Sequence, residues 1–192
     1  MSTAAALGTS SSKLEKAERE FERFHSTSLG GRIDIPSISL RGIQELSRSN
    51  SRDIGRVILI DVRAPCEVAV SKVQGALTRE EFERENMESL LKERDILVPY
   101  CTIGLRSGLY ASYLKKSGGY QNVYNGKGMV CFSHELEVNH LIVDPATGKA
   151  TNKINVHSKQ FDLCSERFET CYISWYEALF DIPSLFTTWL RS

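Results

Sequence analysis

The stretch ILVPYCTIGLRS, residues 96–107, decides the fold of this chain. It opens with a short apolar run that is typical of a buried strand. From Leu105 onward apolar residues return at helical spacing, until a pair of glycines at 118–119 ends the pattern. Cys101 therefore lies where a strand gives way to a helix.

The position of Cys101 favours a negative charge on its sulfur. The first amide groups of a helix have no acceptor within the helix, and the helix dipole adds partial positive charge at the same end. Gly104 allows backbone conformations in which the loop amides point inward as an anion-binding nest, and Arg106 adds a permanent charge. Because the thiolate is the attacking form, we interpret Cys101 as a nucleophile. The alternative is a cysteine that only packs at the end of its strand.

Motifs on both sides of this loop follow a known order. Cys-x-x-Gly-x-Arg-Ser comes after a strand, Ile-Asp-Val-Arg (60–63) and Val-Gln-Gly-Ala (73–76) lie upstream, and Asn-Gly-Lys-Gly-Met (125–129) lies downstream. In this order and spacing the chain resembles the single-domain rhodaneses, which are sulfurtransferases. The resemblance implies that Cys101 is the catalytic nucleophile. It also implies that the substrate is bound by the loop residues Thr102, Ile103, Gly104, Leu105, Arg106 and Ser107.

The resemblance assigns supporting roles to three charged residues. Asp61 and Arg63 belong to the family's Asp-Val-Arg signature at a strand end, and a salt bridge that positions the loop is favoured over direct catalysis. The family commonly has an acidic residue shortly afterwards that pairs with basic partners, and Glu67 occupies that place. The chain departs from the family at Lys72 and Gln74, where the family has histidine and proline.

Short apolar strands alternate with helical segments along the chain. Residues 57–62, VILIDV, form an apolar run of the kind that is buried on both faces of a parallel sheet, and 122–124 is predicted as the last short central strand. This alternation predicts an α/β fold with helices on both faces of the sheet, and the resemblance implies a rhodanese-like central parallel sheet. Ligands of such sheets bind beyond the carboxyl ends of the strands, where Cys101 lies.

Sequence signals also mark the helices. A short helix is expected around residues 40–46, and Pro65 suits the first turn of another helix over 64–70. Thr78 with Glu81 forms a capping box, which predicts a charged, solvated helix running to Arg94.

Three segments divide the chain. Residues 1–34 are expected to form a disordered start and an N-terminal amphipathic helix, residues 35–140 the rhodanese domain, and residues 141–192 a C-terminal extension. Ser12 with Glu15 makes a capping box, at which the N-terminal helix is expected to begin. The apolar stripe of this helix is expected to pack on the chain's own domain rather than on a partner helix, and consists of Leu14, Ala17, Phe21 and Phe24.

The C-terminal extension is unusually aromatic. Residues 141–148 and 154–157 are expected to pair as strands, with His157 a strand residue rather than a catalytic base. Pro183 is expected to divide the last stretch into two helices. So many aromatic side chains usually cover core surface or form a contact between subunits, so we expect the extension to pack on the domain or to join a homodimer.

Charge and hydropathy exclude several classes of function. The 192 residues carry 24 basic and 24 acidic side chains without a polybasic run, which argues against binding to nucleic acid or to an anionic membrane. No apolar run approaches the roughly 20 residues that span a bilayer, and the start lacks the features of a secretory signal. We therefore expect a cytoplasmic protein, with organellar import as the alternative. The five cysteines suit reduced thiols and show no zinc spacing, so neither a metal nor an organic cofactor is expected.

The resemblance implies transfer of a sulfane sulfur from thiosulfate or a persulfide donor, through a Cys101 persulfide, to a thiol or cyanide acceptor. A thioredoxin- or glutathione-type thiol is the expected partner. Thr102, Ile103 and Leu105 make the loop less cationic than in rhodaneses specialised for thiosulfate, which favours a persulfide donor. Cys66 is either a sulfur relay or a packing thiol.

Two other functions are open at this point. Rhodanese-fold phosphatases and arsenate reductases also place a cysteine and an arginine around an anion, but with five residues between them. Cys101 and Arg106 are separated by four, which favours sulfur transfer. The second alternative is a binding or regulatory module without turnover, although inactive relatives commonly lack the cysteine that this chain has.

Overall fold

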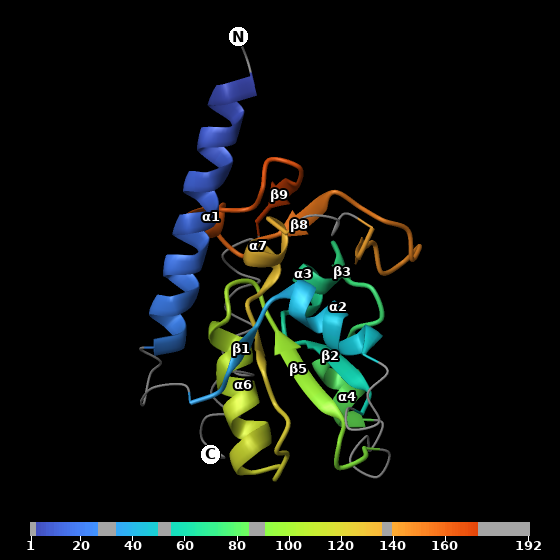
Figure 1. Ribbon diagram of the computed structural model, residues 1–192. Coiled ribbons are helices and arrows are strands. Elements are labelled where there is room, and N and C mark those ends of the chain that lie inside the picture. Colours follow the sequence, from blue (N-terminus) through green and yellow to red (C-terminus); the bar gives the residue numbers. More distant parts are fainter. Residues whose placement is uncertain (1–2, 27–33, 50–54, 85–90, 136–139, 173–192) are drawn as a thin grey trace.

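The computed structural model describes residues 3–26, 34–49, 55–84, 91–135 and 140–172 (Figure 1). Its elements follow in the order α1 (Thr3–Ser26), β1 (Ser37–Ile38), α2 (Leu40–Arg48), β2 (Val57–Asp61), α3 (Pro65–Val68), β3 (Lys72–Val73), β4 (Leu77–Thr78), α4 (Arg79–Arg84), β5 (Ile96–Tyr100), α6 (Leu105–Lys116), β6 (Asn125–Gly126), α7 (Met129–Phe132), β7 (Ile142–Val143), β8 (Lys153–Asn155), a 3-10 helix (Lys159–Phe161) and β9 (Glu169–Cys171).

Parallel strands form the centre of the fold. β2 lies between β4 and β5, and the whole of β2 pairs with β5, starting with Val57 opposite Ile96. On the other side of β5, Leu97 bridges Val123 in parallel, and β6, which follows, pairs in parallel with β1. The predicted α/β fold with parallel central strands is confirmed.

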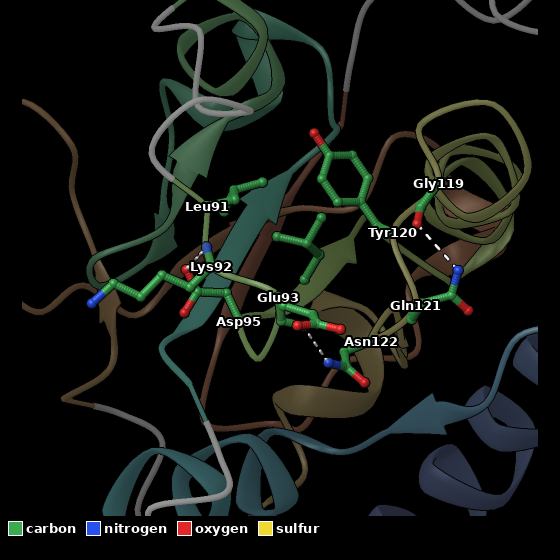
Figure 2. Close-up of a pocket in the computed structure, with 9 residues that line it drawn as sticks. Leu91, Lys92, Glu93, Asp95, Gly119, Tyr120, Gln121 and Asn122 are labelled. Carbon is green, nitrogen blue, oxygen red and sulfur yellow. Dashed lines mark hydrogen bonds between the residues drawn. The ribbon is translucent and has the colours of Figure 1, made fainter.

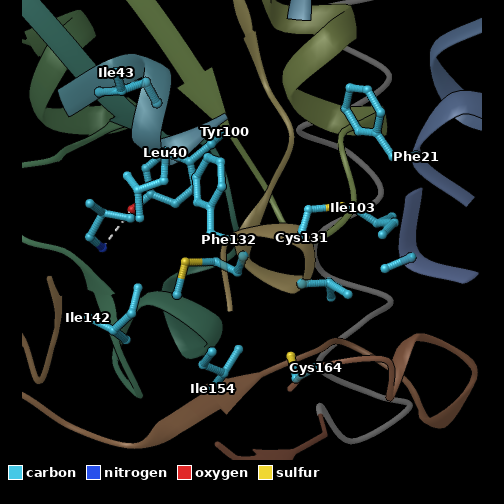
Figure 3. Packing of buried hydrophobic residues seen from close by; sticks show 14 of the residues in the cluster. Phe21, Leu40, Ile43, Tyr100, Ile103, Cys131, Phe132, Ile142, Ile154 and Cys164 are labelled. Atoms are coloured by element: carbon cyan, nitrogen blue, oxygen red, sulfur yellow. Dashed lines mark hydrogen bonds between the residues drawn. The ribbon is translucent and has the colours of Figure 1, made fainter. Parts of the chain in front are cut away.

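Helices cover both faces of the central strands. Successive side chains of a strand point to opposite faces, so on β5 Val98 and Tyr100 enter one apolar layer while Leu97 enters the other. The first layer packs against α1, α2 and α7, and Figure 3 shows part of it. The second layer packs against α4 and α6, through Phe82 and Tyr110. Burial on both faces is the reason that these strands are continuously apolar in sequence.

Local signals start several helices where they were expected. The backbone N–H of Thr78 donates to Glu81 at 2.7 Å, and the N–H of Glu81 donates to the Thr78 hydroxyl at 3.1 Å. This capping box is confirmed, and α4 begins at the next residue. Pro65 is the first residue of α3, as predicted. The helix was expected to run to Arg94; residues 85–90 lie outside the described residues, and residues 91–94 are not helical.

Helix α1 differs from the prediction at its start. It begins at Thr3, so residues 3–12 are helical where a disordered start was expected, and Ser12 lies inside the helix instead of capping it. A helix propagates easily through alanine-rich turns once other turns are held by packing. The later turns of α1 are held, because Ala17 and Phe21 are buried in the main core of the chain.

The predicted strand pairing within the C-terminal extension is wrong. β7 pairs antiparallel with β3, and β8 pairs in parallel with β9. The reason is a tight turn, closed by the N–H of Gly148, that brings Ala150 back against Val143. β7 therefore pairs with β3 and with the segment at Ala150. The predicted partner, which contains β8, pairs with β9 instead.

Other expectations for the extension have mixed outcomes. Phe161 and Phe168 pack against the main core. His157 follows β8 with a positive φ of 66° and is not a strand residue. The aromatic stretch at 173–192, including the predicted division at Pro183, lies outside the described residues. Among the helices that are described, none has the length and apolar character to cross a bilayer.

Candidate active site

Cys101 occupies the turn between β5 and α6. Its side chain is buried, with 1% of its surface exposed. The backbone N–H of Gly104 donates to Cys101 Sγ at 3.1 Å, and the Ser107 hydroxyl donates to the same sulfur at 3.4 Å. Two donors at the mouth of a helix therefore face this sulfur, and both interact more strongly with an anionic sulfur than with a neutral one.

Two glycines shape the loop. Gly104 caps α6 with a φ of 91°, a left-handed conformation that residues with side chains rarely adopt. Gly128 also has a φ of 91°, and a Cβ there would lie 2.7 Å from the carbonyl oxygen of Thr102. Because this glycine has no side chain, the first two amides of α7 can donate to the carbonyl groups of Cys101 and Thr102, at 2.9 and 3.1 Å. The start of α7 thus holds the loop by its carbonyl groups.

A fully buried carboxylate, Glu67 of α3, anchors the loop from another side. It accepts a hydrogen bond from the Thr102 hydroxyl at 2.7 Å and two from the Arg106 guanidinium, at 2.6 and 2.8 Å. Burial alone would raise the pKa of Glu67, but Arg106 above all outweighs it and holds this pKa at about 2. Arg106 is therefore paired with a carboxylate of the protein, where the sequence predicted a charge directed at the substrate.

Asp61 and Arg63 form a second buried ion pair at the end of β2. Nη2 of Arg63 lies 2.7 Å from Oδ2 of Asp61 and donates to the carbonyl of Ser71 at 2.5 Å. The Tyr100 hydroxyl donates to the same carboxylate at 2.6 Å. Burial raises the pKa of Tyr100, and the adjacent Asp61 raises it further, so the hydroxyl keeps its proton. Tyr100 directly precedes Cys101, so its hydrogen bond to Asp61 connects this ion pair to the start of the loop.

The remaining candidates are two loop residues, Ile103 and Leu105, and one further cysteine, Cys66. Ile103 is 4% exposed and belongs to the main core together with Phe21 of α1, so it serves the packing between loop and helix. Leu105 is half-buried at the first position of α6. Cys66 is half-buried on α3, one residue before Glu67.

Two residues that the sequence did not assign to the site, Asn125 and Phe21, contact the loop, and a third, His25, contacts both of them. Nδ2 of Asn125 donates to the Gly104 carbonyl at 3.0 Å, and the ring of Phe21 lies directly against Gly104. His25 stacks on Phe21, and its Nδ1 lies 3.3 Å from Nδ2 of Asn125. Asn125 stands in the downstream motif and Phe21 in the apolar stripe of α1, but neither pattern reveals which loop they meet.

A surface depression lies at the other end of the sheet (Figure 2). It is lined by residues from 91–97 and 119–122, near the amino end of β5, whereas Cys101 follows the carboxyl end. Its buried carboxylate, Asp95, is paired with Arg56 at 2.7 Å. Within the described ranges, no group of three or more His, Cys, Asp or Glu side chains is arranged to hold a metal ion.

No protein-family model and no curated protein matches this sequence. Rhodanese-like domain proteins are among its structural neighbours. The rhodanese-like domain protein of Staphylococcus aureus is 23% identical with a TM-score of 0.40, and the match covers 51% of this chain and 91% of that one. The protein SSP1007 of Staphylococcus saprophyticus is 25% identical with a TM-score of 0.38, over 53% of this chain and 97% of that one.

A variant of EanB in complex with hercynine also matches. It is 17% identical with a TM-score of 0.41, and the match covers 55% of this chain but only 27% of the EanB chain. The first neighbour bears the family name that the sequence motifs predicted. Every one of these TM-scores is below 0.5.

Proposed function

We propose that this chain is a sulfurtransferase in which Cys101 carries the transferred sulfur. The observation that supports this most is the placement of the Cys101 sulfur at the mouth of α6, with the Gly104 N–H at 3.1 Å and the Ser107 hydroxyl at 3.4 Å. Donors fixed in this way stabilise anionic sulfur without rearranging during the reaction. They suit both a thiolate and the persulfide formed from it.

The reaction has two half-reactions. In the first, the Cys101 thiolate attacks the outer sulfur of a donor R–S–S⁻; an S–S bond forms at Cys101, the donor's S–S bond breaks, and R–S⁻ leaves. With thiosulfate as donor, sulfite leaves instead. In the second, an acceptor thiolate or cyanide attacks the outer sulfur of the Cys101 persulfide, takes it, and restores the thiolate. One S–S bond replaces another when a persulfide supplies a thiol, so that exchange needs no external oxidant or reductant.

The charges around the loop favour a persulfide monoanion over the thiosulfate dianion. Arg106 is paired with Glu67 at 2.6 Å, so much of its positive charge is offset within the protein. Within the described part of the chain, the donors to the Cys101 sulfur are one backbone N–H and one hydroxyl, which are dipoles rather than full charges. We therefore extend the proposal to a small-molecule or protein persulfide as donor, and to a thioredoxin- or glutathione-type thiol as acceptor.

The same geometry argues against a phosphatase. A phosphoryl group needs an arginine that clamps its oxygens, whereas Arg106 is engaged in two short hydrogen bonds to Glu67. The spacing of four residues between Cys101 and Arg106 also matches the sulfurtransferase pattern. Hydrolysis of para-nitrophenyl phosphate that depends on Cys101 would reverse this conclusion.

Mapping the persulfide by mass spectrometry tests the proposal. After treatment with glutathione persulfide and removal of the excess, we expect an added sulfur on Cys101 that an acceptor thiol then removes. Cys101→Ser should lose the transfer and keep its circular dichroism spectrum. Cys171→Ser is the matched control, because Cys171 lies on β9 outside the loop. Retained transfer in Cys101→Ser would refute the mechanism, and a folded wild type that never takes up sulfur would favour a binding module.

A steady-state comparison of donors tests the preferred substrate. We expect a higher kcat/KM for glutathione persulfide than for thiosulfate. A clear preference for thiosulfate would overturn the choice of donor while leaving the role of Cys101 intact. Transfer that is lost in Cys66→Ser as well as in Cys101→Ser would assign Cys66 as a relay.

A further inference from the structure

Gly104 forms hydrogen bonds on two sides of the loop. Its N–H donates to Cys101 Sγ at 3.1 Å, while its carbonyl accepts from Nδ2 of Asn125 at 3.0 Å and from the Gly108 N–H of α6 at 3.1 Å. Its φ of 91° and ψ of −8° determine how these two groups are oriented relative to each other. Whatever holds the carbonyl therefore also sets the direction of the N–H that faces the sulfur.

Asn125 is buried and incompletely paired. It is 0% exposed, and its Nδ2 contacts both the Gly104 carbonyl and Nδ1 of His25. Among the described residues, nothing pairs with its Oδ1, which is also buried. A buried amide with an unpaired oxygen destabilises a fold, so this asparagine is poorly explained by stability alone. Its backbone is held in place because its N–H donates to the Pro36 carbonyl at 2.8 Å, where β6 pairs with β1.

Helix α1 completes the support from outside the predicted 35–140 domain. It runs beside α7 and ends near the start of α6 (Figure 1). The ring of Phe21, 1% exposed, fills the space where a Cβ on Gly104 would lie, 2.3 Å from ring atoms. The ring of His25 stacks on Phe21 at 5.2 Å between centroids, which places its Nδ1 at Asn125.

We propose that Asn125, together with Phe21 and His25 of α1, forms a brace that holds Gly104 with its N–H directed at Cys101. These three are positioning residues, because they act on the sulfur through Gly104. The inference deepens the proposed function, on which it rests for the role of Cys101 as nucleophile. In this proposal α1 contributes to the geometry of the site as well as packing on the core.

The intrinsic reactivity of Cys101 tests the brace independently of sulfur transfer. We expect Asn125→Leu, which keeps the size but removes the donor, to slow alkylation of Cys101 by iodoacetamide at pH 7 roughly tenfold, the scale for one hydrogen bond to a charged group. The pH profile of alkylation should move to higher pH. In the ¹H–¹⁵N spectrum the Gly104 amide signal should move in the direction that Cys101→Ser moves it.

Two further variants and a control complete the design. Phe21→Ala should produce the same changes, and the double variant should be no slower than the slower single variant, because both act through Gly104. Glu18→Gln is the control on α1: this residue is half exposed and its ion pair with Lys127 spans 3.7 Å. It should leave the alkylation profile and the Gly104 signal as in the wild type.

The outcomes separate the brace from the proposed function. Folded Asn125→Leu and Phe21→Ala proteins with the wild-type alkylation profile would overturn the brace, whatever happens to sulfur transfer. Slowed alkylation in a protein whose wild type transfers no sulfur would support the brace and refute the sulfurtransferase. If Asn125→Leu fails to fold, the alkylation profile of Phe21→Ala decides alone. Slowed alkylation then supports the brace, and a wild-type profile overturns it.

Discussion

Replacing Glu67 by glutamine is expected to destabilise the fold. The Glu67 side chain is fully buried and accepts hydrogen bonds from Thr102 and Arg106. Removing one partner of a buried ion pair costs roughly 3–5 kcal/mol, because the other charge is left unpaired. Glutamine keeps one acceptor oxygen and nearly the same volume, so we expect a loss near the lower limit, about 3 kcal/mol at pH 7.

The same substitution should remove part of the acid sensitivity. The pKa of Glu67 is about 2 in the fold, against an ordinary value of 4.5. A carboxyl group with a lowered native pKa stabilises the fold fully above its unfolded pKa and loses that contribution as the pH falls toward the native value. At about 1.4 kcal/mol per pH unit, the wild type should lose roughly 2 kcal/mol between pH 5 and pH 3 that the variant does not lose.

Urea unfolding followed by circular dichroism at pH 7, 5, 4 and 3 measures both effects. Glu80→Gln is the control, because Glu80 is 82% exposed and lies 3.9 Å from Arg84; its stability and pH dependence should match the wild type. The reasoning is refuted if Glu67→Gln loses less than about 1 kcal/mol at pH 7, well below the range for a broken buried pair. It is equally refuted if the variant and the wild type have the same pH slope.

Two further substitutions and one labelling experiment test other parts of the structure. Tyr100→Phe removes the 2.6 Å donor to Asp61 and should lower the free energy of unfolding by about 1–3 kcal/mol; unchanged urea stability would contradict the role of this hydroxyl. Gly104→Ala introduces a Cβ 2.3 Å from the Phe21 ring at a φ of 91°, so the thermal midpoint should fall by several degrees, and a midpoint equal to that of the wild type would show that the helix is not seated there. Burial raises the pKa of Cys131 to about 12, so Cys131 stays a thiol at pH 8 and iodoacetamide should leave it unmodified in the folded protein; labelling as fast as in urea would contradict this raised pKa.

Short-range patterns predicted much of the fold. The capping box at Thr78 and Glu81 is complete within four successive residues, and both of its hydrogen bonds form. The apolar run at 57–62 indicated a strand buried on both faces, because such a strand leaves no polar side of its own. The start of α1 was predicted wrongly from an equally local signal, since Ser12 and Glu15 form a capping pattern that the longer helix passes through.

The sequence by itself determined that Cys101 lies between a strand and a helix. A strand, a cysteine, a glycine and a helix follow one another within residues 96–116, so their order fixes where Cys101 lies relative to the helix mouth. The α/β class follows in the same way, from the spacing of apolar residues along each element.

Only the tertiary structure decided which residues surround Cys101. Glu67 reaches Arg106 across 39 residues of chain, and Asn125 reaches His25 across 100. Such contacts depend on how whole elements pack, and one sequence carries no periodic signal for them. For this reason Arg106, which the sequence directed at the substrate, is paired with Glu67, and helix α1, outside the predicted domain, lies against the loop of Cys101.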